Sequence, residues 1–237
     1  LSIRRQRQMC IRDRSTSDLN AGTDSHRTCS ESVYGRRRLE RLPCIMLETE
    51  TYINRKFYQN QINMENDVLK AIKERRSIRR FKADQITDEE LKTVLEAGTW
   101  AATGHGTQKP FIVAVQNTET CAQLRRMNAE VMGVESDPYY GAPTIVIVLA
   151  PCDEVNSVKD GSLILGNMML AAHSIGLASC WINREDSMFA SEEGKQLMKE
   201  WNLPEGLMGI GALALGYASA HPHTVKPRKE DYYRIIK

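Results

Sequence analysis

The sequence predicts one mixed domain of helices and strands that begins near Met64. Three observations predict it. From that residue onward, segments with the apolar spacing of a helix alternate with short runs of β-branched residues. The chain has 237 residues, of which 41% are hydrophobic and 26% charged, and this suits one globular domain with some excess length. Residues 1–63, by contrast, show no sustained period.

Several segments have the pattern of helices. The stretch "MENDVLKAIKERR", residues 64–76, places its apolar side chains on one helical face. In "TDEELKTVLEAGTWAA", Thr87 and Glu90 have the spacing of a capping box. Residues 160–176 are nearly apolar all round and too short for a membrane span, which indicates a helix in a core or at an oligomer interface. Further helices are expected at about residues 118–132 and 190–201.

Four segments have the composition of strands. "FIVAVQ" (111–116) and "TIVIVLA" (144–150) are dense in β-branched residues and are bounded by Pro or polar residues. "SCWI" (179–182) and "MGIGALALGY" (208–217) complete the set. The first two read as buried strands, because runs this dense in β-branched residues are typical of strands covered on both faces.

Residues 1–63 form a separate, basic part of the chain. They contain 12 Lys or Arg and 7 Asp or Glu, whereas residues 64–237 contain 20 and 23. Two interpretations remain open: a disordered basic arm that contacts an anionic partner, or upstream sequence that is not part of the working protein. We favour the second, because "RQRQMCIRDR" resembles translated adapter or vector sequence and Met64 opens the first periodic segment.

Charge and composition argue against several classes of function. The part from residue 64 onward is mildly acidic, so nucleic acid is not expected as its partner. No long apolar run or secretory signal occurs, which predicts a cytoplasmic protein that does not contact membranes. The six cysteines form no CxxC pair or zinc-type cluster, and we interpret them as free thiols. We predict no bound metal.

The stretch "KERRSIRRFK", residues 73–82, concentrates positive charge around one serine. If the helix ends near Arg76 and the chain continues extended, alternate side chains point to opposite sides. The planar guanidinium group suits bidentate contacts to phosphate oxygens, and a serine hydroxyl adds a short donor. The candidates for one anion site are Arg75, Arg76, Ser77 and Arg79. The alternative is a solvated basic face that only complements the helix dipole.

Two other stretches are candidates for ligand contacts. "AATGHGTQKPF", residues 101–111, has glycines that allow a ligand to approach the backbone, and side chains that can form hydrogen bonds. In "VKPRK", Lys226 and Arg228 share one side if the tail is extended, which would make a second phosphate clamp. An ordinary connection and a solvated tail are the alternatives. His173 is expected in the core, and His221 and His223 in a surface loop.

Taken together and in this order, these segments resemble the FMN-dependent nitroreductase family over residues 64–237. The resemblance is carried by "AIKERRSIRRF", "AATGHGTQKPFIVAV", "GAPTIVIVLA", "AAHSIGLASCWI" and "LGYASAHPHTVKPRK". It implies an α+β fold with a central, mainly antiparallel sheet flanked by helices. It also implies an intertwined homodimer with FMN at the subunit interface, in which residues 160–176 contribute to that interface.

The resemblance also implies roles for individual residues. Arg75, Arg76, Ser77 and Arg79 would hold the FMN phosphate, ribityl chain and pyrimidine edge, with Lys226 and Arg228 completing the phosphate site. Trp181, Ile182 and Asn183 would lie along the isoalloxazine. Thr103, Gly104 and Gln108 would contact the flavin from the loop. Here the sequence departs from the family pattern, which often has Asn at the position of Gly106 and Pro-Trp at Lys109 and Pro110.

The chemistry implied is hydride transfer from NADH or NADPH to FMN and then to a small acceptor in a ping-pong cycle. Such an enzyme needs no catalytic side chain, and no nucleophile elbow, Walker motif or HExxH is present. Nitroaromatics, quinones and related molecules are the expected acceptors. Reductive dehalogenation or flavin breakdown on the same fold is one alternative, and anion or nucleic-acid binding through the basic N-terminal arm is another.

Overall fold

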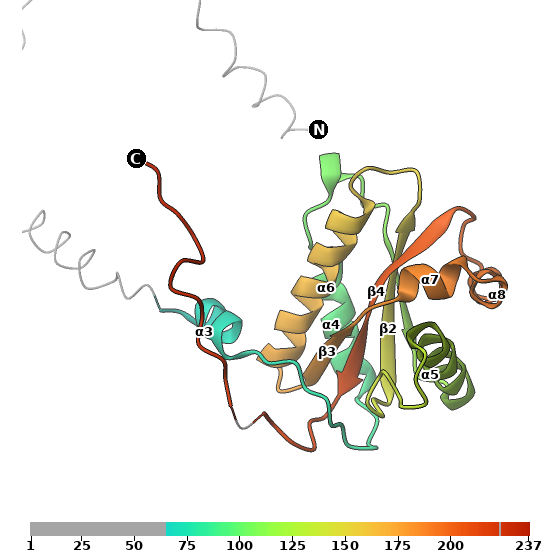
Figure 1. Ribbon diagram of the computed structural model, residues 1–237, viewed down its shortest axis with the longest axis horizontal. Coiled ribbons are helices and arrows are strands. Elements are labelled where there is room, and N and C mark those ends of the chain that lie inside the picture. The colour runs from blue at the N-terminus through green and yellow to red at the C-terminus, as the bar shows by residue number, and fades with distance from the viewer. Residues whose placement is uncertain (1–64, 223) are drawn as a thin grey trace, which may run out of the picture. The chain divides into compact units, whose positions relative to one another are not determined.

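A computed structural model describes residues 65–222 and 224–237 of the chain. These residues form one antiparallel sheet with helices on both faces (Figure 1). The elements, in chain order, are α3 (Asp67–Glu74), α4 (Asp88–Thr99), the short 3-10 helix η1 (Gly104–Gly106), β1 (Phe111–Val115), α5 (Thr118–Met132), β2 (Thr144–Pro151), α6 (Ser157–Ser174), β3 (Ala178–Ile182), α7 (Glu185–Ala190), α8 (Glu192–Glu200) and β4 (Leu207–Gly216). The predicted α+β class is confirmed.

The sheet has the strand order β1-β2-β4-β3, and every neighbouring pair is antiparallel. The two central strands are buried along nearly their whole length, because helices cover both faces of the sheet. Val146 on β2 is opposite Leu213 on β4, and neither side chain is exposed. Uninterrupted apolar runs such as "TIVIVLA" are typical of strands in this position.

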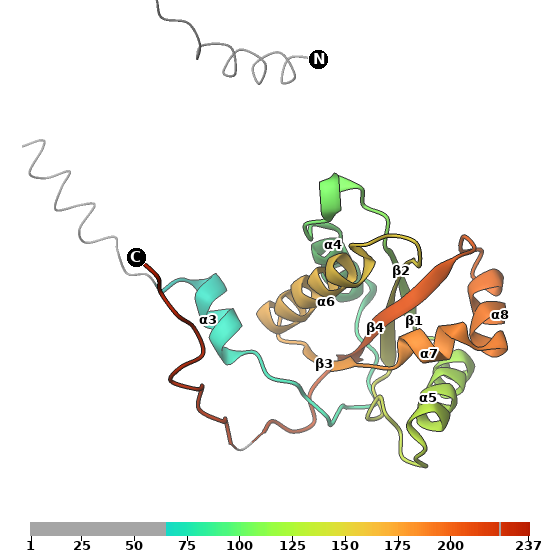
Figure 2. The ribbon, with the colours of Figure 1, turned by 45° about the horizontal axis from the view of Figure 1, so that its top comes forward.

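Two layers of helices cover the sheet (Figure 2). On one face, α5, α7 and α8 pack against the strands through residues such as Leu124, Phe189 and Leu197. On the other face, α4 and α6 do so through residues such as Val94 and Leu165. The apolar residues on one side of α6 are explained by this packing, because that side contacts the sheet and α4. The packing does not explain the apolar residues on its other side.

The predicted capping box at the start of α4 is confirmed. The Thr87 hydroxyl accepts a hydrogen bond from the Glu90 N–H at 3.2 Å, and Glu90 Oε2 accepts one from the Thr87 N–H at 2.8 Å. The Tyr217 hydroxyl, just after β4, also donates to Glu90 Oε2 at 2.7 Å. These contacts lower the pKa of the Glu90 carboxyl and attach the start of α4 to the end of β4.

The chain becomes extended immediately after α3, as the sequence predicts. Arg75 ends that helix with ψ of 133°, and the Ile78 N–H donates a hydrogen bond to the Ser179 carbonyl oxygen on β3. Further on, the Lys82 N–H donates to the Tyr217 carbonyl oxygen. The segment of residues 77–82 therefore lies along the outer edge of β3 and then beside the chain that leaves β4.

Some expectations about the elements need correction. Helix α6 begins at Ser157, three residues before the expected start, and α7 was not expected at all. Helix α3 is shorter than residues 64–76, because Arg75 already has extended geometry. Cys121, Cys152 and Cys180 are free thiols as predicted. The division of the chain into residues 1–63 and 64–237 stays a prediction, since residues 1–64 lie outside those that the structure describes.

None of the helices in the described part of the chain combines the length and the hydropathy of a membrane-spanning segment.

Candidate functional site

A cavity of about 190 Å³ lies where the end of α3, the C-terminal end of α6 and the start of β3 meet. Its walls include cationic side chains and two histidines. The lining residues are Glu74, Arg75, Arg76, Ile78, His173, Gly176, Leu177, Ala178, Ser179, Ala218 and His221. His173 is thus half-buried at this cavity, whereas we expected it inside the core.

Two guanidinium groups in this cavity have buried N–H groups without partners. Arg75 Nη1 and Arg76 Nε are buried and have no hydrogen-bond acceptor among the described residues. Arg76 Nη1, by contrast, donates to the carbonyl oxygens of Lys73 and Arg75, at 2.5 and 2.8 Å. A buried donor without an acceptor is unfavourable, so these nitrogens mark a place where a ligand acceptor would fit.

Arg228 joins this group from the tail of the chain. Burial lowers the pKa of the Arg75 guanidinium below its ordinary value, and the positive charges of Arg76 and Arg228 act in the same direction. Arg228 is therefore near enough to repel Arg75, although 153 positions separate the two in the sequence. No salt bridge to these three arginines occurs among the described residues, so this group of like charges is a candidate site for an anion.

Ser77 and Arg79 lie around the neighbouring thiol of Cys180. Burial raises the pKa of this thiol, whereas Arg79, a hydrogen bond with Ser77, and Arg75 act to lower it. The guanidinium group of Arg79 is itself exposed, and it lies 5.9 Å from the centre of the Tyr140 ring. Ser77, Arg79 and Arg75 thus all act on Cys180, but neither Ser77 nor Arg79 lines the arginine cavity, and their membership of one anion site stays a prediction.

The three predicted residues of the β3 segment differ in what they can offer a ligand. Trp181 is half-buried on the α4 and α6 face of the sheet, where it lies across Gly211 of β4. Ile182 is only 4% exposed and belongs to the core on the other face, so only its backbone is accessible to a ligand. Asn183 follows the strand and is exposed.

The loop with Thr103, Gly104 and Gln108 is anchored at the opposite end of α6. The Gly104 N–H donates to both carboxylate oxygens of Asp160, at 3.1 and 2.9 Å, and the Gln108 N–H donates to the Thr103 hydroxyl. Asp160 is in the first turn of α6, whereas His173, which lines the arginine cavity, is in the last turn. Thirteen residues of helix correspond to about 20 Å. One chain therefore does not bring this loop to the arginines.

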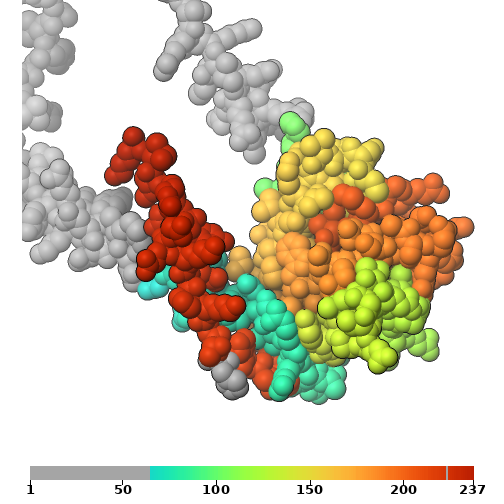
Figure 3. All heavy atoms as spheres, viewed as in Figure 1, coloured from blue at the N-terminus to red at the C-terminus, as the bar shows by residue number. Residues whose placement is uncertain are grey.

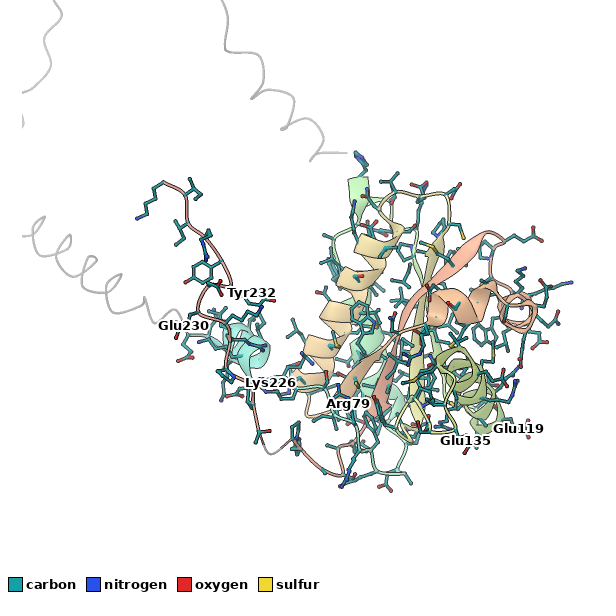
Figure 4. The ribbon with its side chains drawn as sticks, viewed as in Figure 1. Arg79, Glu119, Glu135, Lys226, Glu230 and Tyr232 are labelled. Atoms are coloured by element: carbon teal, nitrogen blue, oxygen red, sulfur yellow. The ribbon has the colours of Figure 1, made fainter. Side chains whose placement is uncertain are left out.

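Lys226 is exposed on the tail. The space-filling view shows that tail next to the segment that contains α3 (Figure 3). Figure 4 shows Lys226 close to α3, whereas Arg79 lies at the foot of the sheet near β3. Of the two predicted tail residues, only Arg228 has an interaction with Arg75 in the described part of the chain.

A sequence model of the nitroreductase family matches residues 72–217, which is more than half of the chain and includes nearly all the residues described above. The chain belongs to the nitroreductase family. The resemblance stated from the sequence motifs is thereby confirmed.

Individual relatives agree with this membership. A crystal structure of a nitroreductase with bound FMN from Bacteroides fragilis is similar with a TM-score of 0.68 and 32% identity, covering 73% of this chain and all of that one. The NADPH-flavin oxidoreductase of Vibrio harveyi is 29% identical over 69% of this chain and 70% of its own length. A protein of Methanothermobacter thermautotrophicus, provisionally named NADH dehydrogenase/NAD(P)H nitroreductase, is 26% identical over 67% of this chain and 81% of its own.

Sequence reasoning missed residues of this nitroreductase-family chain that hold the candidate site segments without lining the arginine cavity. Asp160 fixes the Gly104 loop, and the only signal was a charged residue at the head of an apolar helix. Asn128 on α5 donates a hydrogen bond to the Asn183 carbonyl oxygen at 2.9 Å, and no sequence signal indicates this contact. The pairing of a helix with a strand end depends on tertiary packing, which local patterns do not encode.

Proposed function

We propose that this nitroreductase-family chain is an NAD(P)H-dependent FMN oxidoreductase that reduces nitroaromatic, quinone or related small acceptors. The observation that carries the proposal is the group of buried, unpartnered guanidinium nitrogens on Arg75 and Arg76. Phosphate oxygens are strong acceptors that suit such donors, so the residues fit the phosphate of FMN. The FMN in the B. fragilis relative and the cofactor in the name of the V. harveyi relative support the same reading.

When it is bound, FMN supplies the hydride-transfer chemistry. The chain's own residues supply position and charge. Arg75, Arg76 and Arg228 would bind the phosphate, and the Ser77 hydroxyl would add a hydrogen bond beside it. The backbone after Trp181 would line one edge of the ring system. Arg79 would favour negative charge in this part of the site, which helps the two-electron reduced state.

The absence of a catalytic side chain in the prediction is consistent with a ping-pong cycle. NAD(P)H and the acceptor would occupy one open pocket in turn, and each would exchange hydride directly with the flavin. No side chain of the protein then has to act as a nucleophile. Because Ile182 is buried, only its backbone could line this pocket, whereas the exposed Asn183 could contribute backbone and side-chain atoms. Shape and backbone donors would then select the acceptor.

A homodimer is part of this proposal. A single chain leaves apolar side chains exposed around α3, α4 and α6, among them Ile72 at 49%, Trp100 at 80% and Leu163 at 51%. A second cavity, of about 400 Å³, is lined by residues of these same helices. We propose that a two-fold partner covers this face and brings its own Gly104 loop to the first chain; two-fold symmetry would then produce two such sites per dimer. The loop and the arginines would then complete one site.

The test is spectroscopic. Purified protein, reconstituted with FMN, is expected to be yellow, to bleach under nitrogen when NADH or NADPH is added, and to recover its colour when a nitroaromatic or a quinone is added. A protein that remains colourless after reconstitution would refute the proposal. If the protein bleaches but none of these acceptors restores its colour, it is an NAD(P)H-dependent flavoprotein and the proposed acceptor class is wrong. Reductive dehalogenation and flavin breakdown would then be the reactions to assay.

A further inference from the structure

A buried carboxyl group directly follows the β3 segment of the proposed site. Glu185 is the first residue of α7 and has no exposed surface. Its Oε1 accepts a hydrogen bond from the Tyr139 hydroxyl at 2.9 Å and lies 3.3 Å from Asn128 Nδ2. Its Oε2 is buried without a hydrogen-bond partner among the described residues. A carboxyl group in such a place requires an explanation, because burial of an unpaired polar atom is costly.

Asn128 connects this carboxyl group to the site segment. Its side chain is fully buried on α5. Nδ2 donates to the Asn183 carbonyl oxygen at 2.9 Å, and Oδ1 accepts a hydrogen bond from Arg184 Nε at 2.9 Å. One amide group thus contacts three consecutive residues, Asn183, Arg184 and Glu185.

The turn that these contacts stabilise has an unfavourable backbone conformation and little free space around it. Arg184 has φ of 86°, in the left-handed region that non-glycine residues rarely adopt. On the other side of the turn, a Cβ at Gly209 of β4 would lie 2.2 Å from the Glu185 carbonyl oxygen, so this strand approaches the start of α7 as closely as a glycine permits. The peptide groups between β3 and α7 are therefore held from both α5 and β4.

Resting on the proposed function, we infer that Asn128 and Glu185 are positioning residues of the flavin site. They lie behind the Trp181–Asn183 segment and set the orientation of its last peptide groups, without contacting the cofactor. Because the Asn183 carbonyl oxygen is fixed by Asn128, the backbone facing the flavin is fixed as well. Glu185 in turn holds Asn128 and Tyr139 in place.

The protonation state of Glu185 gives this network a measurable signature. Burial raises the pKa of the carboxyl group to about 7, with the Tyr139 hydroxyl and the Arg184 guanidinium acting in the opposite direction and Asp186 raising it. Among the described residues, Tyr139, Arg184 and Asp186 are the titratable groups that act on it, since α5 contributes the neutral Asn128 and β4 the backbone at Gly209. Deprotonation would add a buried negative charge behind a segment that binds an anionic cofactor.

The experiment measures the FMN dissociation constant and the reduction potential of the bound flavin in the full-length protein. We expect Asn128→Ala to weaken FMN binding about fivefold to tenfold and to shift the potential. Asn117→Ala is the matched control, because Asn117 caps the other end of the same helix through the Thr120 N–H and does not contact the network. It should lower the melting temperature while leaving both flavin readouts unchanged.

A second variant tests Glu185 itself. As the pH rises through about 7, FMN affinity in the wild-type protein should fall relative to that of Glu185→Gln, which stays neutral, so the ratio of the two affinities should change over this range and cancel the ionisation of the FMN phosphate itself. Identical pH profiles, or an Asn128→Ala protein that is less stable but binds FMN with unchanged affinity and potential, would overturn the inference. If Asn128→Ala does not fold, the pH dependence of FMN affinity in two other variants tests the inference. Glu185→Gln should lack the decrease near pH 7, and Tyr139→Phe should show it at higher pH, because the Tyr139 hydroxyl lowers the pKa of Glu185. A wild-type protein without FMN affinity would instead refute the proposed function.

Discussion

The Ile78 N–H donates a hydrogen bond to the Ser179 carbonyl oxygen at 3.0 Å, and this contact joins the basic segment to the edge of β3. It places Ser77 beside Ser179, two residues before Trp181. Two stretches that are about 100 positions apart in the sequence therefore contribute to one region of the surface.

Arg75→Ala combined with Arg228→Ala should remove most of the bound FMN. Each substitution deletes a charge-assisted phosphate contact, and each such contact contributes roughly 1.5–3 kcal/mol, which corresponds to roughly 10-fold to 100-fold in affinity. The measurement is the ratio of flavin to protein after gel filtration, followed by titration with FMN. Arg80→Ala is the control, because Arg80 belongs to the same basic stretch but neither lines the arginine cavity nor is among the charges that act on Arg75. Full flavin occupancy in the double variant would show that the phosphate site lies elsewhere.

Leu163→Asp should produce a monomer that binds FMN poorly. Leu163 is 51% exposed on α6, and a carboxylate there would be buried against an apolar surface if this face is the dimer interface. Val131→Asp is the matched control, since Val131 is 43% exposed on α5, across the sheet from α6. Light scattering coupled to gel filtration gives the mass of each variant. A dimeric Leu163→Asp protein, or a monomer from Val131→Asp, would place the interface on another face.

The elements of this fold were largely predictable because they depend on local patterns. The capping box of Thr87 and Glu90 and the apolar run of β2 each specify their own structure, and both are observed. The buried amide of Asn128 and the carboxyl of Glu185 were not predictable, because each is in a helix whose pattern tolerates it and its partner comes from a distant segment. The arginine cluster lies between these cases. Its residue types indicate an anion site, but only the folded chain brings Arg228 to Arg75.

Stability should fall as the pH rises from about 4.5 to about 7 because of Glu185. The pKa of its carboxyl group is raised from the ordinary value of 4.5 to about 7 in the folded protein. The folded state therefore binds more protons than the unfolded state over this range, and the free energy of unfolding decreases with rising pH, by up to about 3 kcal/mol. Urea denaturation of the FMN-free protein gives the free energy of unfolding of the wild type and of Glu185→Gln at each pH. The difference between these two free energies measures the effect of Glu185. A difference that does not change with pH would mean that Glu185 has the same pKa in both states.

Asp160→Ala should weaken FMN binding even though Asp160 is about 20 Å along α6 from the arginine cavity. The carboxylate is the acceptor for the Gly104 N–H, and without it the loop that carries Thr103 and Gln108 loses its anchor. Asp153→Ala is the control, because Asp153 is exposed in the turn before α6. Unchanged FMN affinity in Asp160→Ala would remove the loop from the proposed site.

Hybrid dimers decide whether the loop acts within its own chain or on its partner. One subunit carries Arg75→Ala and Arg228→Ala, and the other carries Asp160→Ala. If each site combines the arginines of one chain with the loop of the other, a hybrid contains one doubly defective site and one with every residue intact. It should then bind one FMN per dimer with wild-type affinity, although neither parent does. If each site lay within a single chain, both sites of the hybrid would be defective and no affinity would return. Titration of hybrids purified through two different affinity tags makes this distinction.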